Sequence, residues 1–271
     1  MIKKLTISDL PIFAQRAPKT NKYDYGSVLV IGGSVGYLGA PAMSALSAYR
    51  TGSGLVTVLL QKSDYPFYQN YHPEVMVRPY DSIEGLEDIL IKKNVVLFGP
   101  GLKADDPLNE QVLRVLLEKK VPLVIDASGL TILHKLLHLE YSFENVVVTP
   151  HTGEAKMLMD SLRPDEDIDK LTSLGLTVVL KDATTLIADS SRQYLADQGN
   201  PGMATAGTGD VLAGMIASLL GQGHTPLEAA IMGVYLHQSA GNFARSEFGE
   251  DSMMATDVIS HISDAIKKIK K

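Results

Sequence analysis

The chain has 271 residues, with 25 lysines and arginines against 31 aspartates and glutamates, which gives a formal net charge of −6. Hydrophobic residues make up 45% of the sequence and charged residues 21%, so a sizeable core can be buried and disorder of the whole chain is excluded. The sequence has no cysteine, which excludes disulfides, thiolate metal sites and cysteine nucleophiles. The largest basic cluster is the end of the chain, 267–271, so we expect no nucleic-acid partner.

Two observations bear on localisation. Residues 1–9 lack the apolar core of a signal peptide, because a serine and an aspartate interrupt them. The best candidate for a membrane span, 211–223, falls short of the roughly 18 uncharged apolar residues that a span needs. We therefore expect a cytoplasmic protein with no membrane partner.

Short β-branched runs alternate with helical stretches along the chain, a pattern typical of a parallel sheet covered by helices. We predict strands at 27–31, 55–60, 75–78, 95–98, 123–126, 146–149 and 178–180, followed by an antiparallel hairpin of 185–188 and 193–196 at one edge. We predict helices at 40–50, 84–92, 108–119, 131–137, 154–160, 166–174, 211–220, 226–246 and 257–269. No linker or repeat divides the chain, so 1–271 is expected to form one domain whose last three helices cover the sheet.

Glycines follow several predicted strands, where ligands bind in open α/β sheets. Segment 32–40 (GGSVGYLGA) misses the dinucleotide fingerprint G-x-G-x-x-G by one residue, since Ile31 stands where its first glycine belongs. Segments 99–102 (GPGL) and 126–129 (DASG) place small residues at the next strand ends. For Asp126 an Asx-turn or a helix cap is an equally good interpretation.

The most informative segment is 199–210 (GNPGMATAGTGD), which leads into a long apolar helix. Successive amides of glycine-rich backbone at a helix N-terminus can bind an anion. An aspartate at that position would repel a phosphate unless it acts on the phosphate acceptor, so Asp210 is a candidate base that deprotonates an attacking hydroxyl. The structural alternative is that Asp210 only caps its helix.

Motif 206–210 (AGTGD) resembles the anion hole and catalytic aspartate of the ribokinase-like kinases, and the whole chain resembles the ADP/ATP-dependent NAD(P)H-hydrate dehydratases. The resemblance also covers 32–40, 99–102, 124–127, 149–154, 180–181 and 200–205. It implies a ribokinase-like α/β/α sandwich with a mainly parallel sheet. It also implies an enzyme, a carbon-oxygen lyase that uses ADP or ATP to dehydrate the S epimer of hydrated NADH or NADPH.

The resemblance assigns roles to individual residues. Asp210 would be the catalytic base, and the anion hole would be Ala206, Gly207, Thr208 and Gly209. The hydrated dinucleotide would contact Ala40, Gly101, His151 and Asp210. The nucleotide donor would contact Lys181, Asp182, Ala183, Thr184, Thr185 and Gly209. Glu154 would order Mg²⁺ through water, since phosphoryl transfer usually needs a divalent ion. His151 could equally be a structural histidine, and Lys181 a solvated lysine at a strand exit.

Three positions depart from the family pattern, and none is the proposed base. Thr152 replaces a proline, Asp182 replaces a frequent glycine, and Lys103 stands where a glycine is common. Asp182 adds negative charge beside the expected nucleotide site. These departures put the shapes of the loops in question.

The resemblance also implies partners. We expect a homotetramer that works with a separate NAD(P)H-hydrate epimerase, with no fused epimerase domain, because the first predicted strand begins at residue 27. Three alternatives stay open. A vitamin or sugar kinase would release a stable phosphoester, a nucleotide sensor would lack the base, and an NAD-dependent dehydrogenase would transfer hydride without added nucleotide.

Overall fold

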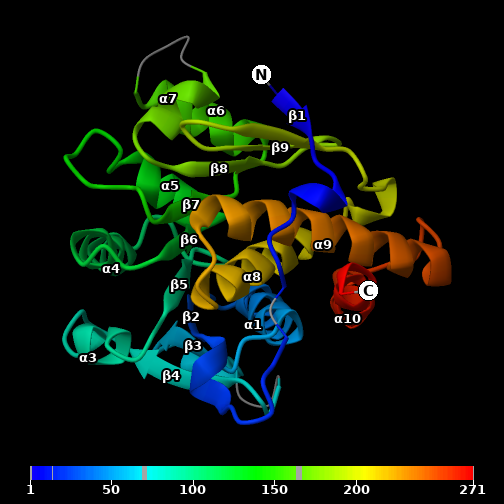
Figure 1. Ribbon diagram of the computed structural model, residues 1–271. Helices are drawn as coiled ribbons and strands as arrows, with labels where there is room; N and C mark the ends of the chain where they lie inside the picture. The colour runs from blue at the N-terminus through cyan, green and yellow to red at the C-terminus, as the bar shows by residue number, and fades with distance from the viewer. Residues whose placement is uncertain (1, 14, 69–71, 163–166, 271) are drawn as a thin grey trace.

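The computed structural model describes residues 2–13, 15–68, 72–162 and 167–270. Among these residues ten strands form one sheet, in the order β1-β10-β9-β8-β7-β6-β5-β2-β3-β4 (Figure 1). The strands are β1 (Ile2–Lys4), β2 (Ser27–Ile31), β3 (Leu55–Gln61), β4 (Met76–Tyr80), β5 (Val95–Phe98), β6 (Leu123–Ile125), β7 (Val146–Val148), β8 (Thr177–Leu180), β9 (Thr185–Ala188) and β10 (Gln193–Ala196). Only β9 runs antiparallel to its neighbours, so the sheet is mainly parallel, as predicted.

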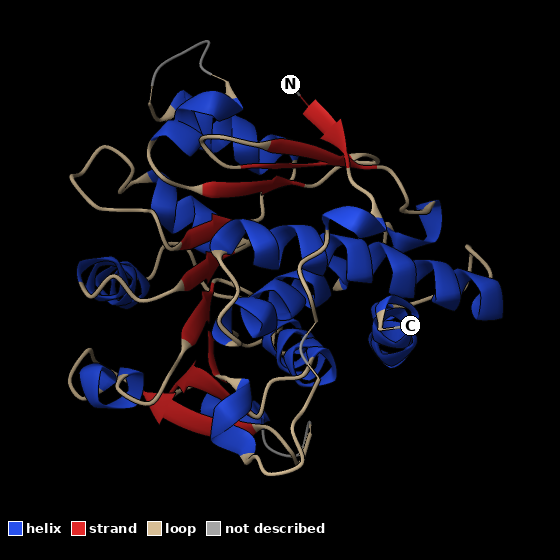
Figure 2. Ribbon diagram, in the orientation of Figure 1, coloured by secondary structure: helices blue, strands red, loops and turns tan. Residues whose placement is uncertain are grey.

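Helices cover both faces of this sheet (Figure 2). One face carries α1 (Gly39–Thr51), α8 (Thr208–Gly221), α9 (Pro226–Phe248) and α10 (Ala255–Ile269). The other carries α3 (Leu86–Leu90), α4 (Pro107–Glu118), α5 (Ser128–His134), α6 (Thr152–Asp160) and α7 (Ile168–Ser173). Alternate residues of β2 serve the two cores: Val28 and Val30 face the first, Leu29 and Ile31 the second. The result is a three-layer α/β/α sandwich, as expected from the sequence.

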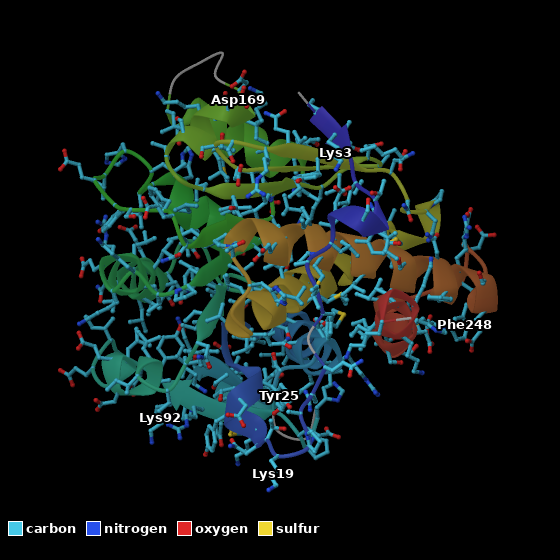
Figure 3. The ribbon with its side chains drawn as sticks, viewed as in Figure 1. Lys3, Lys19, Tyr25, Lys92, Asp169 and Phe248 are labelled. Atoms are coloured by element: carbon cyan, nitrogen blue, oxygen red, sulfur yellow. The ribbon has the colours of Figure 1, made fainter. Side chains whose placement is uncertain are left out.

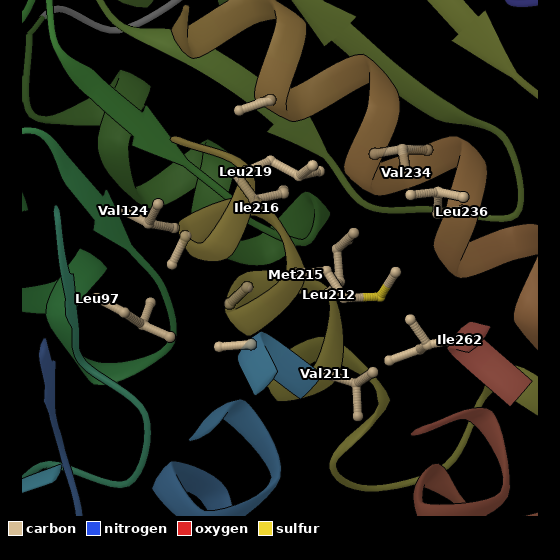
Figure 4. Close-up of a cluster of buried hydrophobic side chains, with 14 of the residues drawn as sticks. Leu97, Val124, Val211, Leu212, Met215, Ile216, Leu219, Val234, Leu236 and Ile262 are labelled. Atoms are coloured by element: carbon tan, nitrogen blue, oxygen red, sulfur yellow. The ribbon is translucent and has the colours of Figure 1, made fainter. Parts of the chain in front are cut away.

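Helix α8 is buried on nearly every side, and Figure 4 shows its apolar side chains between β5, β6 and α9. Gly214 lets α8 approach α1 closely, because a Cβ there would lie 2.2 Å from the Ser44 carbonyl oxygen and from Ser47 Oγ. The Ser44 hydroxyl donates to the carbonyl of Asp210 at 3.0 Å. Helix α1 thus fixes the start of α8.

Most predicted elements are confirmed, and the differences have physical causes. Helix α8 begins at Thr208 rather than at 211, so Thr208 and Gly209 of the predicted anion hole belong to its first turn and Gly207 is its N-cap. The predicted hairpin of β9 and β10 is not the edge of the sheet, because β1 pairs in parallel with β10. Lys3 lies at that edge (Figure 3), where its ammonium contacts Asp9. The short helix α2 (Tyr65–Tyr68) was not predicted, and the predicted start of helix 166–174 lies outside the described residues.

The topology gathers the glycine-rich strand ends. Strand order reverses between β2 and β5, and the carboxyl ends of β2, β5, β6, β7 and β8 lie along one edge of the sheet. Such a switch point is where ligands bind in open α/β sheets. None of the described helices is long and apolar enough to span a membrane.

Candidate active site

The start of helix α8 is shaped for an anion. Gly207 caps it in a left-handed conformation with φ of 91°, and a Cβ there would lie 2.3 Å from Met43 Sδ. The amides that follow belong to the first turn, where they lack partners within the helix and the helix dipole favours negative charge. The predicted residues Ala206, Gly207, Thr208 and Gly209 therefore form one continuous turn directly before Asp210.

Asp210 is the third residue of α8 and is partly buried. Burial and the nearby carboxylate of Asp126 raise the pKa of Asp210 to about 7, while the Lys181 ammonium acts in the opposite direction. A carboxyl group with this pKa is half ionised at neutral pH. It can therefore accept a proton there as a stronger base than an ordinary aspartate.

Lys181 follows β8 and lies beside the same turn. Its Nζ forms an ion pair with Asp126 Oδ1 at 2.8 Å, and it lies 3.4 Å from the position that a Cβ on Gly209 would occupy. Burial favours the neutral amine, but the carboxylates of Asp126, Glu154 and Asp210 raise the pKa of Lys181 above its usual value. The lysine is therefore a fixed cation at the anion site rather than a solvated one.

His151 and Glu154 form a reciprocal cap at the start of α6. The backbone N–H of Gly153 donates to His151 Nδ1 at 3.0 Å, and the N–H of His151 donates to Glu154 Oε2 at 2.9 Å. Because Nδ1 accepts, the proton of the neutral imidazole is on Nε2. His151 is more than half exposed and its backbone pairs with Lys181, so β7 and β8 present both side chains together.

A cavity of about 830 Å³ opens beside these residues, large enough for a nucleotide. It is lined by five of the six predicted nucleotide contacts, Lys181, Asp182, Ala183, Thr185 and Gly209, and also by His151. Thr184, the sixth, is exposed in the same turn. Asp182, one of the three residues that depart from the family pattern, stabilises its own turn, since its Oδ1 accepts a hydrogen bond from the Ala183 N–H at 2.7 Å.

A second loop cluster lies at the start of α1. Gly101 has φ of 72°, and a Cβ there would lie 2.5 Å from the Tyr37 carbonyl oxygen and 3.4 Å from Ala40 Cβ. The Ser34 hydroxyl donates to the Gly101 carbonyl at 2.8 Å. The predicted dinucleotide contacts Ala40 and Gly101 are thus adjacent, and α1 links them to Asp210 through Ser44.

Sequence reasoning missed two residues of this region. His237 of α9 lines the cavity, and its ring lies against the Thr208 backbone. Burial lowers the pKa of His237 to about 4, so the ring is neutral. Asp64, 2% exposed, accepts from the Val35 N–H at 2.9 Å and holds the loop before α1. Neither residue stands in a glycine motif, and only the fold brings them to the site.

The donor set for a divalent cation is sparse. Among the described residues no cluster of three or more acidic or histidine side chains could hold a metal ion. Glu154 keeps one carboxylate oxygen in the α6 cap, and Asp126 is paired with Lys181. With so few free carboxylate oxygens, the site fits a Mg²⁺ ion that arrives on nucleotide phosphates and keeps most of its waters. It does not fit an ion that is enclosed by protein ligands.

The fold and this site define the class. A mainly parallel sheet with helices on both faces, and a Gly-x-Gly-Asp sequence at the start of α8, is a ribokinase-like nucleotide-binding fold. The chain is 31% identical to a ribokinase-like superfamily protein of Enterococcus faecalis, with a TM-score of 0.85 over 99% of this chain and 96% of that one.

Residues 28–264 match the family model described as NAD(P)H-hydrate dehydratase, and the chain belongs to that family. It is 33% identical to the ADP-dependent (S)-NAD(P)H-hydrate dehydratase of Nitrosopumilus maritimus, over 94% of this chain and 93% of that relative. It is 36% identical to the bifunctional NAD(P)H-hydrate repair enzyme of Coxiella burnetii over 93% of this chain, but spans only 52% of that relative's length.

Proposed function

We propose that the protein uses ADP or ATP to dehydrate the S epimer of hydrated NADH or NADPH and so restores the intact cofactor. The observation that carries the proposal is Asp210, with a pKa of about 7, in the first turn of α8 beside Lys181 and the large cavity. Family membership supports the substrate, and relatives named as ADP-dependent support the nucleotide donor.

In the first step Asp210 accepts the proton of the hydroxyl on the hydrated nicotinamide ring. The oxygen attacks the terminal phosphorus of the donor, a P–O bond to the leaving nucleotide breaks, and ADP becomes AMP or ATP becomes ADP. The amides of Gly207, Thr208 and Gly209 stabilise charge on the transferring phosphoryl group, and the Lys181 ammonium adds to it.

In the second step the phosphorylated ring loses inorganic phosphate. Hydroxide is a poor leaving group, whereas phosphate can be expelled by the lone pair of the enamine-like ring nitrogen. Loss of a proton from the adjacent carbon then restores the ring double bond. The same Asp210 that accepted a proton in the first step must release it before the next turnover, and its pKa near neutrality permits this.

The proposal assigns each ligand its own contacts. The nucleotide would occupy the cavity lined by Lys181 and α9, and the hydrated dinucleotide would lie against Ala40, Gly101 and His151, which also lines that cavity. When bound, Mg²⁺ supplies charge neutralisation for the phosphates, and Glu154 would hold it through water. In this proposal the hydroxyl of the dinucleotide and the phosphorus of the donor meet at Asp210.

We further propose cooperation with an NAD(P)H-hydrate epimerase and a homotetrameric assembly in the cytoplasm. Bifunctional relatives of about twice the length support the first. Phe248 (Figure 3) and Met254 are 41% and 58% exposed near the junction of α9 and α10, which supports an apolar contact surface there. Light scattering on the purified chain tests the assembly, and a monomer would contradict it.

The function is tested by product analysis. Purified protein is incubated with Mg²⁺, hydrated NADH and ADP or ATP, and phosphorus NMR follows the donor. The proposal predicts inorganic phosphate in equal amount to NADH formed. A stable phosphoester with no NADH would instead identify a small-molecule kinase, and NADH formation without nucleotide would exclude the phosphorylation step.

A further inference from the structure

Asp126 is held in position by an unusually constrained backbone at the end of β6. Its N–H donates to the Phe98 carbonyl at 3.1 Å, and its own carbonyl accepts from the Gly129 N–H at 3.0 Å. Gly99 passes so close that a Cβ there would lie 1.9 Å from the Asp126 carbonyl oxygen. The next residue, Ala127, has φ of 50° and ψ of −129°, a conformation that costs a non-glycine residue about 1–3 kcal/mol.

This strained turn buries a charge. Asp126 is 2% exposed, and its carboxylate pairs with Lys181 at 2.8 Å. A buried carboxylate without such a partner is costly, so the pair fixes both side chains. Lys181 in turn faces Glu154 and Asp210. The Lys181 ammonium therefore interacts electrostatically with three carboxylates. Among the described residues, only Asp126 lies within ion-pair distance of it.

We propose that Asp126 is a positioning residue for the phosphoryl-transfer step: its carboxylate, buried at the end of β6, pairs with the Lys181 ammonium and holds it beside the first turn of α8, which leaves the Asp210 carboxylate unpaired among the described residues and able to accept the hydroxyl proton. The inference rests on the proposed function of Asp210. Without Asp126, the Lys181 ammonium would be free to pair with Asp210 itself. A base neutralised in this way would accept a proton less readily.

The charged groups around Asp210 come from four elements. Asp126 follows β6, Lys181 follows β8, Glu154 belongs to α6 and acts on Lys181, and His237 of α9 is neutral. Burial and Asp126 raise the pKa of Asp210, and Lys181 lowers it. Asp126→Asn removes a carboxylate that raises the pKa of Asp210. It also frees the Lys181 ammonium, which lowers that pKa, so both changes lower the pKa of Asp210.

The test is a direct titration of Asp210 that needs no substrate. Protein labelled with [13C]aspartate is titrated by carboxyl NMR, and Asp210→Asn identifies the resonance. In Asp126→Asn the midpoint for Asp210 is expected to fall by roughly one pH unit or more, whereas Asp126→Glu, which keeps the charge, stays near the wild-type midpoint. Asp106→Asn is the matched control, because Asp106 caps α4 and accepts from Gln61 away from Asp210. An unchanged or raised midpoint in folded Asp126→Asn overturns the inference.

The pH profile of turnover provides the second measurement. In Asp126→Asn the acid limb of the kcat/KM profile should move to lower pH, because an Asp210 with a lower pKa is ionised at lower pH. The plateau of the profile should fall, because that carboxylate is a weaker base. A merely structural role would lower the rate without moving the limb, and that result would also overturn the inference. If no dehydratase activity exists, the proposed function fails while the titration still decides the role of Asp126.

Discussion

Replacing Asp210 by asparagine should stabilise the protein above neutral pH while removing its proposed base. The pKa of Asp210 is about 7 in the folded protein against an ordinary value of 3.8, so the folded state binds a proton that the unfolded chain has released between these values. The stability that this proton contributes is complete below 3.8 and lost as pH rises through about 7. Each pKa unit corresponds to about 1.4 kcal/mol, so the ionised carboxylate costs roughly 4 kcal/mol at pH 8.

Urea unfolding of wild type and Asp210→Asn at several pH values measures this cost. The advantage of the variant should be near zero at about pH 4, grow by about 1.4 kcal/mol per pH unit, and level off above about pH 7. Groups that do not interact with Asp210 titrate alike in both proteins and cancel in the difference. A variant less stable than wild type at pH 8, or an advantage independent of pH, would refute the electrostatic account of Asp210.

Three further predictions follow from the site. Gly207→Ala should lose about 1–2 kcal/mol of stability and weaken ADP binding in calorimetry, because of its positive φ and the contact with Met43. Gly223 has a similar φ of 96°, and a Cβ there would have no neighbour within 4 Å, so Gly223→Ala should lose stability with unchanged ADP affinity. Equal ADP affinities in Gly207→Ala and Gly223→Ala would contradict the anion-hole geometry. Lys181→Met should lower the free energy of unfolding by about 3–5 kcal/mol, since it leaves Asp126 buried and unpaired, and a change under 1 kcal/mol in chemical denaturation would contradict that. Turnover of the wild type should fall about tenfold per pH unit below about pH 7 in a pH-rate profile, as Asp210 gains its proton, and a flat profile down to pH 5 would show that another group is the base.

The sheet could largely be predicted from the sequence because its inner strands are continuous apolar runs. The limits of β2, β5, β9 and β10 agree with the prediction. The strand β1 could not be predicted, since its three residues are exposed and its register depends on β10, far along the chain. The start of α8 was placed too late, because Thr208, Gly209 and Asp210 are poor helix formers that the cap at Gly207 nevertheless brings into the first turn.

The site was predictable where a single segment carries it and not where the fold assembles it. Asp210 and the anion-binding turn stand together in 206–210. The ion pair of Asp126 with Lys181 joins the ends of two strands that are not adjacent, and His237 reaches the cavity from a helix on one face of the sheet. Glycine spacing contains no information about these contacts, because they depend on strand order and helix packing.

The most direct test of the central claim is the absorbance of reduced nicotinamide after hydrated NADH is added to the protein with Mg²⁺ and ADP or ATP. The account predicts a nucleotide-dependent rise for the wild type and none for folded Asp210→Asn that still binds nucleotide. A rise of wild-type size in Asp210→Asn would contradict the role of the base. No rise with verified substrate and folded wild type would contradict the dehydratase function itself.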